Sequence, residues 1–424
     1  MGEHILADNV RQFHKGMDGE IGFVHEFHML NAYYIIMNKE NVNRIKKGLN
    51  IMNEGLCLAG LSKNEEQFIQ AGNVWEFRGY CGLFGFCVGD ALGVPVEFSA
   101  REERKKDPVR EMRAYGTHRQ PAGTWSDDTS LMLCLIDAIN RGYSIQKVAD
   151  NFIDFYRNGA FTPYGEVFDI GMSTRDAIEK MCDGELPVKC GGVSDMDNGN
   201  GSLMRVLPLA FYGRKMKGAQ FISLVEEVSS LTHRHRRSVF ACILYVKFAS
   251  RLAENGWSGG KETALDETIA FMREYCSVTY ESEWNHFDRI LNKKILGLPE
   301  DEIRSTGYVV DTLEAALWGF FHGSSYREVV LKAVNLGGDT DTIAAVAGGL
   351  AGIYHNRGWS VPARDRNKKD YTEEIPEEWL QSLAKKEELN KMFQRFYKVC
   401  DMSAWKRFSA GSRQTWRLSP RKGY

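Results

Sequence analysis

Two short acidic segments, each followed at once by an apolar run, constrain this fold more than any other feature of the sequence. The first is Ser126-Asp127-Asp128, ahead of an apolar run over 131–136, and the second is Asp339-Thr340-Asp341-Thr342, ahead of a run over 343–349. Asp, Ser and Thr are the usual residues at a helix N-terminus, because their side chains accept hydrogen bonds from its free N–H groups. A helix needs only one such cap, however, and each segment carries two carboxylates.

The additional carboxylates favour a metal site, with helix capping as the alternative. Carboxylates at close range repel one another unless a cation separates them. Oxygen ligands without histidine or cysteine suit Mg²⁺ or Mn²⁺ rather than zinc. Four carboxylates would formally balance two divalent ions, and they are Asp127, Asp128, Asp339 and Asp341. The sequence therefore predicts a binuclear site that the two helix starts share.

Helical periodicity elsewhere predicts an all-α protein. Apolar residues recur at three- and four-residue steps over 145–156, between Ser144 as the predicted N-cap and Gly159 beyond the end. Similar patterns predict helices over 238–253, 311–322 and 326–334, the last opened by a capping box at Ser325. The sequence shows neither a series of strand-and-turn patterns nor a repeat of 20–50 residues, which disfavours β folds and solenoids.

Length, charge and cysteine usage limit the class of protein. A chain of 424 residues fits one large domain with appendages, or two domains. Its net charge of -2 provides no general field that would attract nucleic acid or an anionic membrane. Nine scattered cysteines without zinc spacing indicate small core residues in a reducing compartment. Because no signal peptide or membrane span is recognisable, we expect a cytoplasmic protein.

Two glycine-containing motifs are further candidates for the site. Residues 192–205 include Asn200-Gly201-Ser202, and such a loop running into a helix could hold a diphosphate on its backbone N–H groups. It matches neither a Walker P-loop nor a dinucleotide-binding fingerprint. Residues 82–97 predict a glycine-spaced apolar helix that ends near Glu97. Helix packing is the alternative explanation for those glycines.

In this order, the motifs resemble the ADP-ribosylglycohydrolase family, the hydrolases that remove ADP-ribose from modified acceptors. The matching stretches are GLFGFCVGDALGVPVEF, GTWSDDTSLML, GNGSLMRVLPLA with the later LTHRHRRSVFAC, GGDTDTIAAVAGGLAGIYH and IPEEW. They span residues from about 78 to 385. The resemblance implies a compact all-helical domain with two Mg²⁺ ions, or Mn²⁺ in some members, at the base of a cleft.

The resemblance also implies a role for each matched residue. The implied metal ligands are Ser126, Asp127, Asp128, Asp339, Asp341 and Thr342. The implied substrate-binding residues are Asn200, Gly201 and Ser202 in the phosphate-contacting loop and a ligand-facing His233, for which a core histidine is the alternative. Glu97 matches a mobile acidic position near the scissile bond. Cleavage passes through an oxocarbenium-like state, so we expect Glu97 or a metal-bound carboxylate (Asp127, Asp128 or Asp339) to transfer the proton.

Three segments and one substrate are predicted. Residues 1–77 would form an N-terminal extension, 78–385 the hydrolase domain, and 386–424 a C-terminal helix and basic tail. The stretch from Gly89 to Glu97 looks most like family members that act on ADP-ribosyl-arginine, so we predict that acceptor on a protein substrate. We expect no membrane or nucleic-acid partner.

The extension raises the possibility of a second function. Certain bacterial members of the family are immunity proteins that also bind an ADP-ribosyltransferase toxin through an N-terminal extension. Residues 1–77 carry aromatic side chains suited to an interface, namely Phe23, Phe27, Tyr33 and Tyr34. We therefore predict that they bind a cognate transferase, or else that they cover the domain's own surface or form a dimer contact.

Two other functions compete with hydrolysis of ADP-ribosyl bonds. The chain could be a binding protein that uses the hydrolase fold as a scaffold, although its complete set of ligand positions argues against that. A metal-dependent phosphohydrolase would also use paired aspartates, but no phosphatase nucleophile motif accompanies them here.

Overall fold

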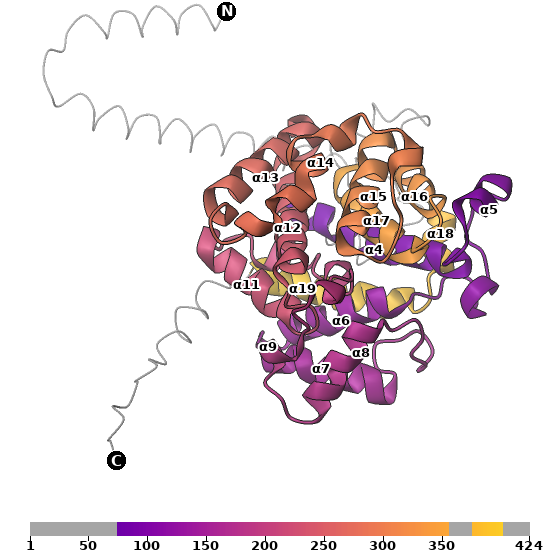
Figure 1. Cartoon of the computed structure of the whole chain (residues 1–424). Coiled ribbons are helices and arrows are strands. Elements are labelled where there is room, and N and C mark those ends of the chain that lie inside the picture. Colours follow the sequence, from indigo (N-terminus) through magenta and orange to yellow (C-terminus); the bar gives the residue numbers. More distant parts are fainter. Residues whose placement is uncertain (1–73, 356–374, 402–424) are drawn as a thin grey trace, which may run out of the picture. The chain divides into compact units, whose positions relative to one another are not determined.

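The computed structural model describes residues 74–355 and 375–401, which belong to one structural unit. Within these ranges the chain forms helices, turns and loops, with isolated bridges in place of strands, so the predicted all-α class is confirmed (Figure 1). Of the predicted extension over 1–77 only residues 74–77 are described, and they begin the first of the described helices. The rest of the extension and the basic tail after Asp401 lie outside the described residues.

The elements keep the labels of Figure 1. The α-helices are α4 (Val74–Gly93), α5 (Arg101–Lys106), α6 (Asp127–Asn140), α7 (Ile145–Asn158), α8 (Met172–Cys182), α9 (Pro187–Cys190), α10 (Leu209–Tyr212), α11 (Gly218–Ser230), α12 (Arg236–Gly259), α13 (Lys261–Cys276), α14 (Asp288–Leu291), α15 (Val309–His322), α16 (Tyr326–Val334), α17 (Thr340–His355), α18 (Glu377–Ser382) and α19 (Lys386–Asp401). The 3-10 turns are η1 (Val94–Val96), η2 (Gly116–His118), η3 (Asp195–Asp197), η4 (Leu203–Arg205), η5 (Glu281–Phe287), η6 (Lys294–Leu296) and η7 (Glu300–Glu302).

Helices α4 and α17 form the centre of the fold and run in opposite directions with their backbones in contact. A Cβ atom added to Gly89 would lie 2.1 Å from the carbonyl oxygen of Ala344, and one added to Gly93 would lie 2.3 Å from the amide nitrogen of Asp341. The glycines of α4 therefore allow close helix packing, which was the alternative explanation for them. The same packing places the end of α4 beside the start of α17.

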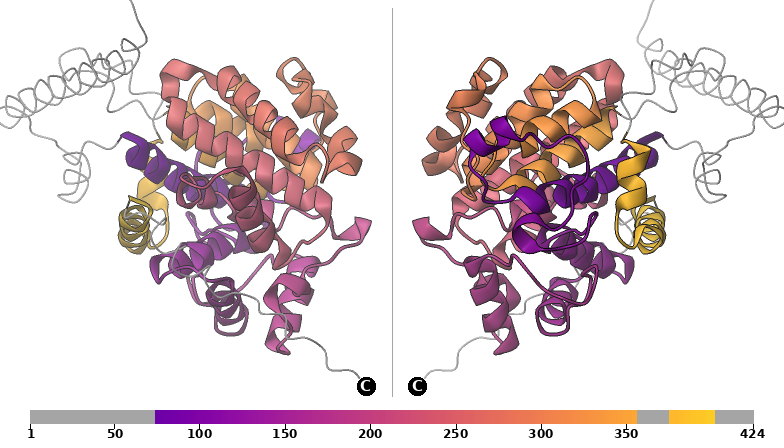
Figure 2. Two further views of the ribbon diagram at one scale, coloured as in Figure 1. Left: turned by 90° about the vertical axis from the view of Figure 1, so that its left-hand side faces the viewer. Right: turned by 90° about the vertical axis from the view of Figure 1, so that its right-hand side faces the viewer.

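The remaining helices cover this pair. Helices α15 and α16 pack against α17, while α6 to α8 lie on the other side of α4, and α19 packs on α6 and α4 (Figures 1 and 2). The stretch Arg78–Val96 is long and apolar enough to cross a membrane by length and composition, but 94% of it is buried inside the protein. A buried core helix can have this length and composition without crossing a membrane.

Local sequence signals locate the four helices whose bounds the sequence predicts. Helix α7 begins after Ser144, whose hydroxyl accepts a hydrogen bond from the backbone N–H of Lys147, and it ends at Gly159 with φ of 67°. The predicted helices 238–253 and 311–322 lie within α12 and α15, and 326–334 is α16. Seven of the eight cysteines in the described ranges are buried, as expected for small core residues.

One local prediction is wrong. The loop over 192–205 does not run into a long helix, because the chain after Ser202 forms only the single turn η4 and then the four-residue α10. Pro208 explains the difference, since it lacks an N–H group and disfavours helical geometry at the residue before it. The dipole of a long helix therefore does not stabilise an anion at this loop.

Candidate metal centre

The start of α6 is held by a buried acid from α4. Asp90 Oδ1 accepts a hydrogen bond from the backbone N–H of Ser126 at 2.9 Å, and its Oδ2 accepts one from the N–H of Thr129 at 3.0 Å. The Ser126 hydroxyl accepts the N–H of Asp128 at 3.2 Å. Asp90 and Ser126 thus cap α6, so capping does not explain why Asp127 and Asp128 are acidic.

The start of α17 is held by the loops around it. Gly338 has φ of 74°, and a Cβ atom there would lie 2.1 Å from the carbonyl oxygen of Ser305, so only glycine fits. The Gly338 carbonyl accepts the N–H of Phe98 at 2.7 Å, which fixes the residue after Glu97 to this turn. This turn therefore places Glu97 beside the acidic start of α17.

The two acidic segments come together as predicted. The Thr342 hydroxyl, from the second segment, donates to Asp128 Oδ1, from the first, at 3.2 Å. Three groups of side chains have potential ligand atoms within 4.8 Å of one another, namely Asp90, Asp128 and Asp341; Glu97, Asp339 and Asp341; and Glu97, His118 and Asp169. Shared members join the three groups into one continuous cluster. Asp127 lies at the same helix start but is in none of the groups.

Three carboxylate oxygens in this cluster are suited to bind a cation. Asp128 Oδ2, Asp339 Oδ1 and Asp341 Oδ2 are buried and make no hydrogen bond within the described chain. A buried charged oxygen without a partner is strongly unfavourable. Among the described residues, His118 is the one basic group within ion-pair distance of these carboxylates, and burial disfavours its charged form. All-oxygen ligands of this kind suit a hard divalent ion, so these residues fit the metal ions that the sequence predicts.

The electrostatics of the cluster also favour bound cations. Burial raises the pKa of Asp127, Asp128 and Asp341 well above the ordinary value, and repulsion from neighbouring carboxylates raises it further. Burial also raises the pKa of Asp339. Without cations, these groups cannot all be ionised at neutral pH.

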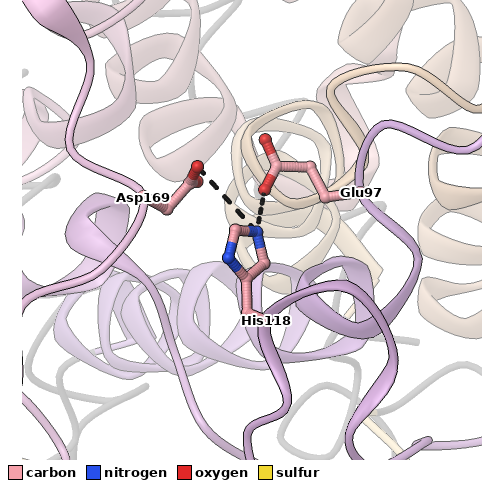
Figure 3. Close-up of side chains that lie close together, drawn as sticks. All are labelled: Glu97, His118 and Asp169. Atoms are coloured by element: carbon pink, nitrogen blue, oxygen red, sulfur yellow. Dashed lines mark hydrogen bonds and ion pairs between the residues drawn. The ribbon is translucent and has the colours of Figure 1, made fainter.

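Glu97 lies at one end of the cluster against a histidine that sequence analysis did not identify (Figure 3). Glu97 Oε2 is 2.5 Å from His118 Nε2, and the Thr117 hydroxyl donates to the Glu97 carbonyl oxygen at 2.8 Å. The turn η2 therefore holds Glu97 at both its carboxylate and its backbone. Asp169 approaches the same His118 Nε2, with its Oδ1 at 3.9 Å.

Burial makes these three groups candidates for proton transfer. Burial and the charges of Asp169 and Asp339 raise the pKa of Glu97 to about 11. Burial also raises the pKa of Asp169 to about 6. Burial also lowers the pKa of His118. These shifts favour the un-ionised form of Glu97 and the neutral form of His118, and the two side chains lie within hydrogen-bonding distance.

The predicted phosphate-contacting residues face in different directions. Asn200 Nδ2 donates to Asp339 Oδ2 at 2.7 Å and to the Thr312 hydroxyl at 3.0 Å, so its side chain supports the metal centre. The Ser202 hydroxyl is fully buried and lies 3.3 Å from Cys242 Sγ. Ser202 could therefore contact a ligand only through its backbone.

Gly201 and His233 lie against each other behind this loop. A Cβ atom on Gly201 would be 2.7 Å from His233 Cε1, so a larger residue would displace the ring. His233 is 2% exposed, and its Nδ1 lies 2.7 Å from the Thr232 hydroxyl. Its burial agrees with a core histidine, while its position beside the loop agrees with a ligand-facing one.

Sequence analysis missed Asp90, His118 and Asp169. A signal for Asp90 was present, because a carboxylate inside the apolar helix over 82–97 requires a buried partner. His118 and Asp169 lie in loops without a motif or periodicity, and no local signal identifies them.

Comparisons with known proteins identify relatives of this chain. Residues 76–405 match the family described as ADP-ribosylglycohydrolase. The chain is 32% identical over 320 residues to the ADP-ribosylarginine hydrolase Tri1 of Pseudomonas putida (strain GB-1), covering 74% of this chain and 76% of that relative. It is 30% identical over 317 residues to the protein of the same name from Serratia proteamaculans (strain 568), covering 74% and 77%. A solved structure described as an ADP-ribosylglycohydrolase-related protein complex has a TM-score of 0.60 at 28% identity, covering 77% of this chain and 99% of that one.

Proposed function

Because the chain belongs to the ADP-ribosylglycohydrolase family and is a hydrolase that removes ADP-ribose from an acceptor, we propose that its acceptor is an arginine side chain of a protein. The observation that carries this proposal is the acidic end of the cluster, where Glu97 and Asp169 converge on His118. A guanidinium is a planar cation whose N–H groups match carboxylate oxygens. A serine acceptor lacks these N–H groups and would gain little from the carboxyl oxygens of Glu97 and Asp169. Two relatives named as ADP-ribosylarginine hydrolases support the same acceptor.

We propose that two divalent ions, Mg²⁺ or Mn²⁺, are held at the meeting point of α6 and α17. Asp128, Asp339 and Asp341 would hold them through their unpartnered oxygens, with Ser126, Asp127 and Thr342 as the neighbouring oxygen ligands. Bound there, the ions would supply positive charge that orients the ribose hydroxyls and stabilises developing negative charge.

The proton is handled by the chain's own residues. Burial favours the protonated form of Glu97, and the contact between its Oε2 and His118 Nε2 holds the carboxyl group in place. When the bond between the ribose and the guanidine nitrogen breaks, the departing nitrogen must gain a proton, and a water molecule that adds to the ribose must lose one. Glu97 can give the first proton and accept the second, so the group ends the reaction as it began.

The test compares two acceptors and two metal conditions. The full-length protein is incubated with one substrate ADP-ribosylated on arginine and another on serine, with EDTA and after Mg²⁺ or Mn²⁺ is restored. We expect release of ADP-ribose from the arginine-linked substrate, loss of release in EDTA and recovery with metal. Release from the serine-linked substrate alone would overturn the arginine assignment. Full activity in EDTA would overturn the metal assignment.

We also propose a second function, in which residues 1–77 bind a cognate ADP-ribosyltransferase toxin in the cytoplasm and the hydrolase reverses its damage. The family match begins at residue 76, so nearly all of this segment lies outside it. Four aromatic residues support an interface, namely Phe23, Phe27, Tyr33 and Tyr34. The alternatives are a contact with the domain itself and a dimer contact.

Separation of function distinguishes these alternatives. An Asp127→Ala variant should still protect cells by binding the toxin, whereas a protein lacking residues 1–73 should protect only through hydrolysis. A shortened protein that is insoluble, or a full-length protein that captures no transferase from its native cells, would favour the structural alternatives.

A further inference from the structure

A buried arginine lies behind the loop that carries Asn200. Arg205 is fully buried, and its guanidinium lies 5.1 Å from the centroid of the Phe152 ring. It donates hydrogen bonds to the carbonyl oxygens of Gly201 and Val228. A third bond runs from its Nη1 to the Thr232 hydroxyl at 2.7 Å. These are neutral acceptors, so the positive charge is held at this position by hydrogen bonds.

The direction of these bonds determines where the proton of His233 lies. A guanidinium only donates, so Thr232 Oγ1 accepts from Arg205. The same oxygen lies 2.7 Å from His233 Nδ1, and this hydroxyl makes no third hydrogen bond in the described ranges. If Nδ1 carried the ring proton, the fully buried hydroxyl hydrogen would have no acceptor, which is unfavourable. The hydroxyl therefore donates to Nδ1, and the ring proton lies on Nε2.

The other edge of the ring faces the glycine loop. A Cβ atom on Gly199 would lie 3.2 Å from His233 Nε2, and one on Gly201 would lie 3.4 Å from it. Within the described chain, Nε2 makes no hydrogen bond, and the Asn200 side chain between the two glycines reaches Asp339 of the metal centre. Burial and the Arg205 charge lower the pKa of His233 to about 3, so the ring is neutral. Nε2–H is thus a free donor beside the site.

We propose that Arg205 and Thr232 are positioning residues that fix neutral His233 as its Nε2–H tautomer, which donates a hydrogen bond to an oxygen of ADP-ribose at the 199–202 loop. The identity of the ligand rests on the proposed function, whereas the tautomer follows from the hydrogen bonds alone. Gly201 leaves room for this arrangement, because a Cβ atom there would meet both the Thr174 hydroxyl at 2.6 Å and the His233 ring at 2.7 Å.

The tautomer can be measured without a ligand. In protein labelled with ¹⁵N at histidine, long-range ¹H–¹⁵N spectra show which ring nitrogen carries the proton, and the spectrum of a His233→Asn variant identifies the His233 signals. We expect Nε2 to be protonated and Nδ1 to accept a hydrogen bond. A protonated Nδ1 in the unmodified protein would overturn the proposal.

Binding of ADP-ribose, measured by calorimetry, tests what the tautomer does. Thr232→Val removes the hydroxyl at similar volume and should weaken binding about tenfold, whereas Thr232→Ser should restore it and keep the Nε2–H signal. Thr268→Val is the matched control, because Thr268 is equally buried but bonds only to the carbonyl oxygen of Ala264 within α13. Thermal unfolding of each variant separates a binding defect from misfolding.

The outcomes separate this proposal from the proposed function. Unchanged binding by Thr232→Val, or binding by Thr232→Ser as weak as that of Thr232→Val, would overturn the positioning role. An Nε2–H signal in a protein that hydrolyses no ADP-ribosyl substrate would support the tautomer and overturn the function instead. An Nδ1–H signal in a protein that hydrolyses its substrate would support the function and overturn the tautomer.

Discussion

Replacing Glu97 with glutamine should stabilise the fold of the metal-free protein while it abolishes hydrolysis. The substitution removes an ionisable group from a buried site where its charge is opposed by burial and by Asp169 and Asp339. The amide keeps the size of the side chain and can still form a hydrogen bond with His118 Nε2. Glu97→Gln therefore removes the cost of protonating this carboxyl group on folding, without opening a cavity.

The magnitude follows from the raised pKa of Glu97. This pKa is 4.5 in an ordinary setting and about 11 in the folded protein, so the folded state binds more protons and its stability falls as pH rises through this window. A pH of 7 lies about 2.5 units above the ordinary pKa of Glu97. At ~1.36 kcal/mol per pH unit, protonating this group on folding costs about 3 kcal/mol, which Glu97→Gln removes. For a domain of this size, we expect a rise in melting temperature of roughly 5–10 °C.

Thermal unfolding in EDTA at pH 5, 6, 7 and 8 measures this effect. The difference between Glu97→Gln and the unmodified protein should be small at pH 5 and should grow with pH. Glu102→Gln is the matched control, because Glu102 is exposed and Lys105 lowers its pKa, so its neutralisation should not stabilise the protein. A difference that does not grow with pH, or a melting temperature at or below that of the unmodified protein at pH 8, would refute the reasoning.

Three further predictions concern the metal centre and the helices that frame it. Asp339→Ala should abolish hydrolysis and also the rise in melting temperature on adding Mg²⁺ or Mn²⁺, which a metal titration followed by thermal unfolding would detect. Asn200→Ala should lower metal affinity or kcat by about 10- to 100-fold, because it removes the donor that orients Asp339, and a normal metal titration together with normal kcat would contradict this role. Gly89→Ala should destabilise the protein by about 3 kcal/mol in denaturant unfolding, since its Cβ would meet the backbone of Ala344, whereas Gly297→Ala, which meets nothing within 4 Å, should be nearly neutral.

The parts of the site that sequence predicts are those encoded by local pattern. The starts of α6 and α17 are visible because acidic residues precede apolar runs of helical period, and the structure brings Asp128 and Asp341 into one group. Helix α7 is predicted for the same reason, since Ser144 and Gly159 are close in sequence to the groups they cap. Interactions within a few residues leave a signal in the order of amino acids.

The parts that sequence does not predict depend on loop geometry. Phe98 and Asp169 have φ of 62° and 58°, a conformation that non-glycine residues seldom adopt, and these turns flank the contact between Glu97 and His118. Neighbours in one motif can also face opposite ways. Asn200 turns toward Asp339 while Ser202 turns toward Cys242, because a 3-10 turn replaces the expected helix.

The backbone contact between α4 and α17 has a consequence for which ions the centre can accept. Gly93 touches Asp341 and Gly89 touches Ala344 with no side chain between them, and Asp90 of the same helix holds the start of α6, so both acidic helix starts are fixed to α4. Mg²⁺ binds oxygen at about 2.0–2.1 Å and Ca²⁺ at about 2.3–2.6 Å. A centre framed in this way should select cations by radius, and Ca²⁺ should compete poorly for it even at concentrations well above those of the smaller ions.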